Sequence, residues 1–270
     1  MNPLAIALRG VPPMGVGVYA RSQNAAFLSR FRIVALHGSQ VGHTDIARTL
    51  KNPLRSLWLY STPEYWYPNT WQATLENYLA QVASLGLDGI IADPETGWGG
   101  HDADAVRLGA ALAAASSQCR IGVTSFPAFG PLQALADACE GKVFGSPQIY
   151  GNVGAANLAR WYGRWTSAFG KGRVLASICA SDQRITPDTA PITTEAAYKQ
   201  YLSDLPASPG YLGWTTGSSP EWIFSNLGSA GPFLGRNAAK ALAALRAPVS
   251  LALVVIFIVA FAAWAVHHGI

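Results

Sequence analysis

The sequence predicts an α/β protein. We expect a (β/α)8 barrel of the TIM type over residues 1–235, a linker helix over residues 236–247 and a single membrane-spanning helix over residues 248–267. Three observations predict this organisation. Eight short apolar runs alternate with amphipathic runs, no glycine-rich phosphate loop follows the first run, and a long uncharged run lies near the C-terminus.

The expected strands are short runs rich in β-branched and aromatic residues, bounded by polar or turn-forming residues. They are Gly15–Tyr19, Arg32–Leu36, Ser56–Tyr60, Gly89–Asp93, Arg120–Thr124, Val143–Ile149, Arg173–Ile178 and Gly210–Trp214. The expected helices lie between and after them, at Ala25–Arg30, Thr44–Leu50, Thr70–Leu85, Asp102–Ser117, Leu132–Ala138, Ala155–Phe169, Thr194–Leu205 and Glu221–Leu227. Capping residues support two of these helices, because Asp102 is a good first residue and Gly86 stands where a helix usually ends.

Strands that alternate with helices pair in parallel through crossovers. Eight such units in about 235 residues fit a barrel near the compact end of its size range. An open doubly wound sheet is the alternative. That fold would more naturally carry a G-x-G-x-x-G loop after the first strand, whereas VGVYARSQN stands there in this sequence.

The charge of the chain is unevenly distributed. The formal net charge is +4, but three basic residues, Arg236, Lys240 and Arg246, follow the last acidic residue, Glu221. The first 235 residues are therefore nearly neutral, which argues against a nucleic-acid-binding face. The three cysteines are widely spaced without a C-x-x-C pair, so they predict neither a disulfide framework nor a zinc site.

The C-terminal apolar run VSLALVVIFIVAFAAWAV, at 249–266, predicts a membrane anchor. It carries no charge, and a helix of about 17–25 such residues spans a bilayer. A buried core helix is the alternative, but such a helix usually has a polar stripe. Because basic residues precede the run and none follows it, we expect the large domain on the cytoplasmic side of a membrane or inside a virion.

Two carboxylates lie at the end of the fourth expected strand, in the segment LDGIIADPETGW at 87–98. Asp93 and Glu95 are separated by Pro94, which fits poorly inside a central strand and marks the point where regular pairing stops. Residues two apart on a strand share a face, and barrel chemistry lies at the carboxyl ends of the strands. Two carboxylates this close favour one bound proton at neutral pH, as a general acid for cleaving a glycosidic bond requires.

Aromatic and amide side chains gather near other expected strand ends. Aromatic faces stack on sugar rings, and polar groups at the rim bond sugar hydroxyls. We therefore expect a carbohydrate-binding cleft lined by Trp58, Tyr60, Trp98, Gln148, Tyr150, Asp182 and Trp214, with Glu95 and Asp93 as its catalytic pair and with no cofactor or metal.

The segment LDGIIADPE resembles the fourth-strand signature of the chitinase-like glycoside hydrolases of family eighteen, D-G-x-D-x-D-x-E. Asp88, Gly89, Asp93 and Glu95 match, whereas Ile91 stands in place of the first acid of the trio. The resemblance implies that Glu95 protonates the glycosidic oxygen and that Asp93 holds the substrate's N-acetyl group, which attacks the anomeric carbon. By strand order it also implies that Tyr150 lies near that group and Trp214 beneath the sugar.

The D-x-E segment also resembles, more loosely, the lysozyme-like muramidases of family twenty-five, although their further Asp near the end of the first strand is missing from VGVYARSQN. Both families act on N-acetylated β-1,4 glycans. The expected partners are therefore a polysaccharide, peptidoglycan or a chitin-like polymer, and a lipid bilayer. A glycan-cleaving domain on the cytoplasmic side suits a virus that lyses or penetrates a host cell.

Other functions remain open. Ile91 favours a barrel that binds glycan without cleaving it, as an attachment or structural protein. A metal site that combines Asp93 with His37, His43 or His101 is a further alternative, although no H-E-x-x-H spacing supports it. A serine triad built on Ser125 or Ser181 lacks a G-x-S-x-G elbow.

Overall fold

The computed structural model describes residues 15–20, 25–29, 31–38, 43–52, 55–150, 153–179, 192–205, 208 and 210–214. It contains eight strands in one sheet. They are β1 (Gly15–Ala20), β2 (Ile33–His37), β3 (Ser56–Tyr60), β4 (Gly89–Ala92), β5 (Arg120–Ser125), β6 (Phe144–Pro147), β7 (Ala176–Cys179) and β8 (Gly210–Trp214).

The sheet is parallel and closes on itself. Its order is β6-β5-β4-β3-β2-β1-β8-β7, and every pairing between neighbouring strands is parallel. A parallel bridge between Gly145 and Val174 joins β6 to the segment before β7. The Gly145 N–H donates to the Arg173 carbonyl at 2.9 Å, and the Leu175 N–H donates to the Gly145 carbonyl at 2.8 Å. The expected barrel is therefore confirmed over the described residues.

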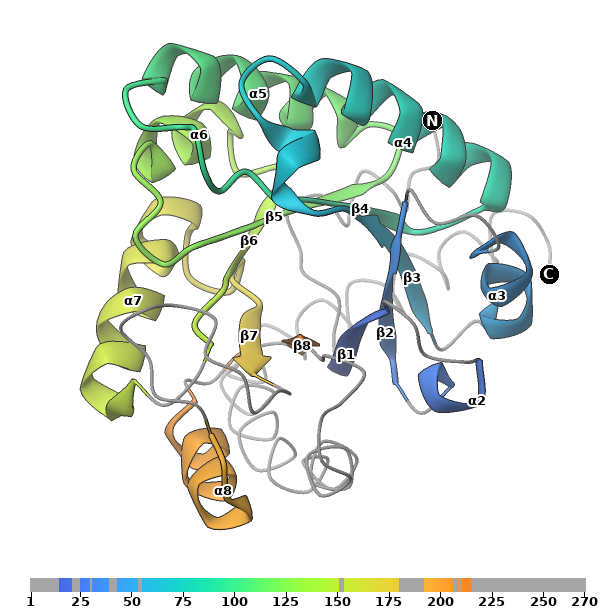
Figure 1. Ribbon diagram of the computed structural model, residues 1–270. Helices are drawn as coiled ribbons and strands as arrows, with labels where there is room; N and C mark the ends of the chain where they lie inside the picture. The colour runs from blue at the N-terminus through green and yellow to red at the C-terminus, as the bar shows by residue number, and fades with distance from the viewer. Residues whose placement is uncertain are drawn as a thin grey trace, which may run out of the picture.

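Helices surround the strands (Figure 1). They are α2 (Ala25–Leu28), α3 (His43–Leu50), α4 (Trp71–Leu85), α5 (Asp102–Ala115), α6 (Leu132–Ala138), α7 (Gly154–Phe169) and α8 (Glu195–Asp204), with a 3-10 turn, η1 (Pro63–Trp66), before α4. Gly86 ends α4 in the left-handed conformation with φ of 64°, and its N–H bonds to the Val82 carbonyl. Thr194 caps α8 by accepting a hydrogen bond from the Ala197 N–H at 3.2 Å.

Several strands end earlier or begin later than the sequence predicts. β4 stops at Ala92 and not at Asp93, because Pro94 lacks the N–H that would continue the ladder. β6 covers only Phe144–Pro147, which is shorter than the expected range at both ends. Asp93 and Gln148 therefore each lie one residue beyond the carboxyl end of a strand, β4 and β6 respectively.

The apolar core has two parts, one inside the barrel and one between the strands and the helices. The inner part consists of Ile33, Ala35, Trp58, Tyr60, Ile91, Phe144, Leu175 and Leu212. Two strand glycines make room for its largest rings. A Cβ on Gly89 would lie 2.4 Å from Cζ3 of Trp58, and one on Gly122 would lie 2.4 Å from Cζ of Phe144. The outer part holds the apolar faces of the helices against the sheet.

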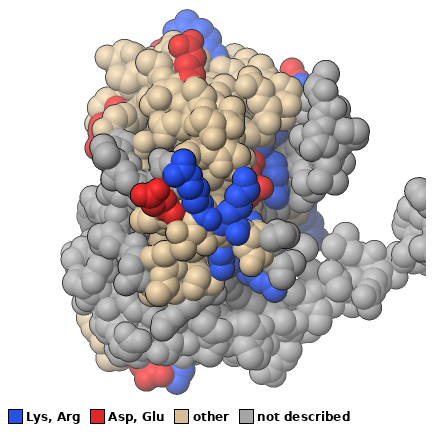
Figure 2. Space-filling view, turned by 90° about the vertical axis from the view of Figure 1, so that its right-hand side faces the viewer, with Lys and Arg blue, Asp and Glu red and all other residues tan. Residues whose placement is uncertain are grey.

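Basic side chains gather near the middle of the side on which α2 and α3 lie, with acidic residues beside them (Figure 2). On α3, Arg48 pairs with Asp45 at 3.4 Å. Arg55 donates hydrogen bonds to the carbonyls of Phe31, Leu50 and Ser29 at 3.0, 2.6 and 2.7 Å. The Arg55 side chain therefore stabilises the loops around β2 and β3.

The expected helix at Glu221–Leu227, the linker at 236–247 and the anchor at 248–267 lie outside the described residues. Within the part of the chain that the structure describes, no helix is both long enough and apolar enough to span a membrane. The membrane anchor stays a prediction.

Candidate functional site at the carboxyl ends of β4 and β6

Asp93 and Gln148 are joined at the carboxyl end of the barrel. Gln148 Nε2 donates a hydrogen bond to Oδ1 of Asp93 at 2.7 Å, although the two residues are 55 positions apart. Both side chains are buried, with 6% exposed. β4 brings Asp93 to this position and β6 brings Gln148, with β5 between them. The sequence predicted both residues for the site, and the structure brings them together.

Asp93 and Glu95 form a coupled acid pair. Burial raises the pKa of Asp93 well above its usual value, and the neighbouring charge of Glu95 raises it further. Burial also raises the pKa of Glu95, which is only partly covered. A hydrogen bond between the two carboxyl groups couples their titration, so the pair shares its first bound proton. Gln148 lowers the pKa of both acids, because its amide N–H stabilises a carboxylate.

Ser125, the last residue of β5, contacts the backbone on both sides. Its hydroxyl donates a hydrogen bond to the carbonyl of Pro94, which stands between the two acids. Its own carbonyl accepts a hydrogen bond from the Gln148 N–H at 2.8 Å. The side chain is 0% exposed. One residue therefore connects the loop after β4 to the end of β6.

A third carboxylate, Glu64, lies in η1 and was not predicted for the site. Its negative charge raises the pKa of both Asp93 and Glu95. The Thr62 hydroxyl donates to Oε1 of Glu64 at 2.6 Å. Its position shortly after β3 was the available signal, because Tyr60 pairs with Ile91 and the loops after β3 and β4 therefore start side by side.

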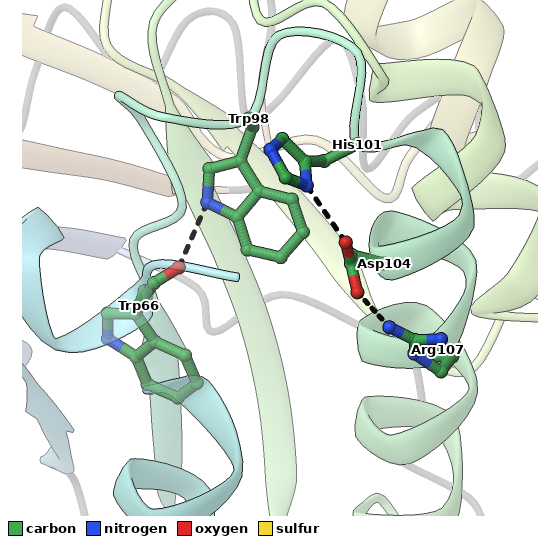
Figure 3. Close-up of polar contacts among 5 residues, drawn as sticks. All are labelled: Trp66, Trp98, His101, Asp104 and Arg107. Carbon is green, nitrogen blue, oxygen red and sulfur yellow. Dashed lines mark hydrogen bonds and ion pairs between the residues drawn. The ribbon is translucent and has the colours of Figure 1, made fainter. Parts of the chain in front are cut away.

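The loop after β3 is tied to the loop after β4. Trp98 Nε1 donates a hydrogen bond to the Trp66 carbonyl at 2.9 Å (Figure 3). The Thr96 hydroxyl lies 3.5 Å from the Tyr67 hydroxyl. These contacts hold η1, and Glu64 with it, beside the segment that carries Glu95.

The structure corrects the placement of Trp58. The sequence placed this ring at the barrel mouth, but its side chain is 0% exposed and lies in the inner core near the amino-terminal end of the strands. Its Nε1 donates to the Ser56 hydroxyl at 2.7 Å, and its ring meets Phe144 edge-on at 5.4 Å. The strand was predicted correctly. The position of Trp58 along it directs the ring toward the base of the barrel.

Three other predicted rings are also packed. Tyr60 lies at the carboxyl end of β3 with 1% exposed, and His37 contacts it edge-on at 5.2 Å. Trp98 is 1% exposed and contacts Phe129 at 6.2 Å, and Tyr150 is 2% exposed. In this structure these rings present no open face for a sugar. Asp182 and the side chain of Trp214 lie outside the described residues, so their role stays a prediction.

Ile91 lies inside the barrel with 0% exposed, among the apolar residues of the inner core. Ile90 and Ala92 belong to the outer core, so successive side chains of β4 point alternately outward and inward, as they do in a barrel strand. The alternation places Gly89, Ile91 and Asp93 on the inner face. Asp93 therefore has no acidic neighbour beneath it and makes its carboxyl contact with Glu95 instead.

Of the histidines predicted as alternative metal ligands, the structure places the side chains of His37 and His101, whereas the side chain of His43 lies outside what it describes. His101 Nδ1 lies 2.9 Å from Oδ2 of Asp104, whose other oxygen meets Arg107 (Figure 3). His101 therefore joins a surface network at the start of α5. Among the described residues, no three His, Cys, Asp or Glu side chains are arranged to hold a metal ion.

Known structures resemble this fold at low sequence identity. A family eighteen (GH18) chitinase from Pseudoalteromonas aurantia is 12% identical with a TM-score of 0.58, over 78% of this chain and 98% of the chitinase. A chitinase from Chromobacterium violaceum is 12% identical with a TM-score of 0.55, over 80% and 99%. The spore cortex-lytic enzyme of Bacillus cereus is 10% identical with a TM-score of 0.56, over 81% and 74%.

No protein-family model matches the sequence, and no curated protein matches it. The structural similarity therefore defines the class of fold, a parallel barrel of the kind that these chitinases and this cortex-lytic enzyme share. The resemblance to the family twenty-five muramidases stays a prediction.

Proposed function

We propose that this protein is a glycoside hydrolase that cleaves an N-acetylated β-1,4 glycan, with Glu95 as general acid and Asp93 assisting. The observation that carries the proposal is the coupled acid pair at the carboxyl end of β4, in which Asp93 is buried and accepts a hydrogen bond from Gln148 and Glu95 is partly buried. Barrel enzymes carry their chemistry at this end of the strands. A protonated carboxyl group near neutral pH is what breaking a glycosidic bond requires.

The proton on the pair must change place for this chemistry. In the free protein Asp93 and Glu95 share this proton. A substrate amide that donates its N–H to Asp93 would favour the Asp93 carboxylate, as the Gln148 amide does. The proton would then pass to Glu95, which delivers it to the leaving oxygen. The acetamido oxygen would attack the anomeric carbon, as the resemblance to family eighteen implies.

The substrate class is an N-acetylated polymer, and we favour peptidoglycan over chitin. Solved structures of similar fold include both chitinases and a spore cortex-lytic enzyme, so the fold itself is compatible with either polymer. The uncharged run at 249–266 supports a membrane-tethered enzyme. A viral lysis or penetration enzyme, with its barrel on the cytoplasmic side or inside a virion, fits that tether.

Turnover by the full chain in detergent tests the proposal. The chain is incubated with purified peptidoglycan and with chitin oligomers, beside Glu95→Gln and the control Glu76→Gln. Glu76 lies on α4 outside the acid pair. We expect new reducing ends from one substrate, a loss of at least about a hundredfold in Glu95→Gln and no change in the control. Equal rates in Glu95→Gln and the parent would refute the role of Glu95.

A barrel that binds glycan without cleaving it is the second candidate, and Ile91 favours it. Ile91 stands in place of the first acid of the family eighteen trio, and its side chain is 0% exposed. Retained binding of peptidoglycan with no release of reducing ends, in the parent chain across pH 4 to 8, would select this function. Cleavage at any pH in this range would exclude it.

A further inference from the structure

Ser125 has a buried hydroxyl group that the sequence made a candidate for a serine triad. Its hydroxyl donates to the Pro94 carbonyl and its side chain is 0% exposed. This hydroxyl bonds a backbone carbonyl and not a histidine ring. The bond to Pro94 instead connects it to the backbone between the two acids of the proposed site.

The neighbouring residue on β5 makes a similar bond without reaching the site. The Thr124 hydroxyl donates to the Ser146 carbonyl at 2.7 Å, and its side chain is 1% exposed. Thr124 therefore fastens β5 to β6 within the sheet. Ser125 fastens β5 to the loop after β4, where pairing has already stopped at Ala92. Both hydroxyls are buried and both donate to a backbone carbonyl, so Thr124 is a suitable control for Ser125.

The position of Ser125 sets the distance between the acids and their amide partner. The Gln148 N–H donates to the Ser125 carbonyl at 2.8 Å, and the Gln148 side chain donates to Asp93 at 2.7 Å. Asp93, Pro94, Ser125 and Gln148 therefore form a closed ring of contacts. The peptide bond joins Asp93 to Pro94, and hydrogen bonds join Pro94 to Ser125, Ser125 to Gln148 and Gln148 to Asp93. The hydroxyl bond and the side-chain bond of Gln148 to Asp93 therefore hold the loop after β4 against Gln148 together.

We propose that Ser125 is a positioning residue for the proposed reaction, and that its bond to Pro94 holds Asp93 and Glu95 in the buried contact with Gln148. This inference rests on the proposed function for its effect on turnover. Its effect on the acid pair does not depend on catalysis. Releasing the loop would admit water to the pair, weaken the effect of burial and displace the acids from the substrate.

The experiment compares Ser125→Ala with Thr124→Val in the full chain. The first readout is the titration of Asp93 and Glu95, followed by carbon-13 NMR of their side-chain carboxyl carbons and assigned with Asp93→Asn and Glu95→Gln. The second readout is the pH dependence of kcat and kcat/KM on the glycan that the parent cleaves. Thermal unfolding of both variants measures the purely structural cost of losing a hydroxyl bond.

We expect both variants to lose similar stability, because each loses one buried bond. Only Ser125→Ala should lower the apparent pKa values of the pair, by about one unit, because water reaches the acids. It should also lower kcat by about tenfold, with a smaller change in KM, and move the alkaline limb of the activity profile to lower pH. If Ser125→Ala does not fold, Ser125→Cys keeps a weaker donor and should give a smaller shift in the same direction.

An unchanged titration of the pair in Ser125→Ala, or an equal shift in Thr124→Val, would overturn the inference. A shifted titration in a chain whose parent cleaves no glycan would support the positioning role and reject the proposed glycosidase. The experiment therefore distinguishes failure of the positioning role from failure of the proposed glycosidase function.

Discussion

The amide of Gln148 and the carboxyl of Asp93 meet at 2.7 Å, and this contact joins the ends of β6 and β4 across β5. The amide N–H stabilises the carboxylate and lowers the pKa of Asp93, whereas burial and Glu95 raise it. The proton affinity of the acid pair is therefore a balance between burial and one hydrogen bond. Gln148 is the residue that reduces that affinity.

Replacing Gln148 by Met should tighten proton binding by the pair. The substitution keeps the length of the side chain and removes the N–H donor, so the pKa of Asp93 should rise further. We expect turnover to fall by about tenfold and the acid limb of the pH profile to move to higher pH, because an Asp93 carboxylate forms only at higher pH. The pH dependence of kcat measures this shift, and Gln133→Met on the exposed face of α6 is the control.

The raised pKa of Asp93 makes stability depend on pH. A buried carboxyl whose pKa is higher in the folded state contributes stability at pH values below its unfolded pKa, and this contribution is lost as pH rises through the folded pKa. We expect the melting temperature of the parent to fall with rising pH over that range. Asp93→Asn should flatten this slope and be the more stable chain at alkaline pH. A slope that persists unchanged in Asp93→Asn would contradict the assignment.

Glu64→Gln should lower the pKa of both acids. The negative charge of Glu64 raises those values, so a neutral amide removes the repulsion. The alkaline limb of the activity profile should move to lower pH by about half a unit, and the change should shrink in 0.5 M salt because Glu64 is exposed. Glu76→Gln, which removes a charge from α4, should leave the profile in place.

The inner core should tolerate no side chain at Gly89. A Cβ there would lie 2.2 Å from the Arg120 carbonyl oxygen and 2.4 Å from the Trp58 ring. We expect Gly89→Ala to lower the free energy of unfolding by about 3 kcal/mol or more, because backbone and a buried ring must both move. Gly99→Ala, whose Cβ would meet no atom within 4 Å, is the control and should cost less than about 1 kcal/mol. Chemical denaturation compares the two.

The sequence by itself determined the order of the elements and the place of the two acids. Strand patterns are local, so β3 and β8 have the predicted bounds and most other strands differ by a few residues at most. Asp93 and Glu95 were predictable because a proline after an apolar run marks the end of a central strand. Gln148 was predictable as a residue near the end of another strand. Its bond to Asp93 was not.

Only the tertiary structure decided which side chains are packed and which belong to the site. Trp58 and Tyr60 share one strand, yet Trp58 lies near the base of the barrel over Gly89, a residue 31 positions later that the closed sheet brings beneath it. Glu64 entered the site from η1 and Ser125 from the end of β5. Closing a barrel juxtaposes residues that are far apart in the chain, and no local pattern of polarity encodes which of them meet.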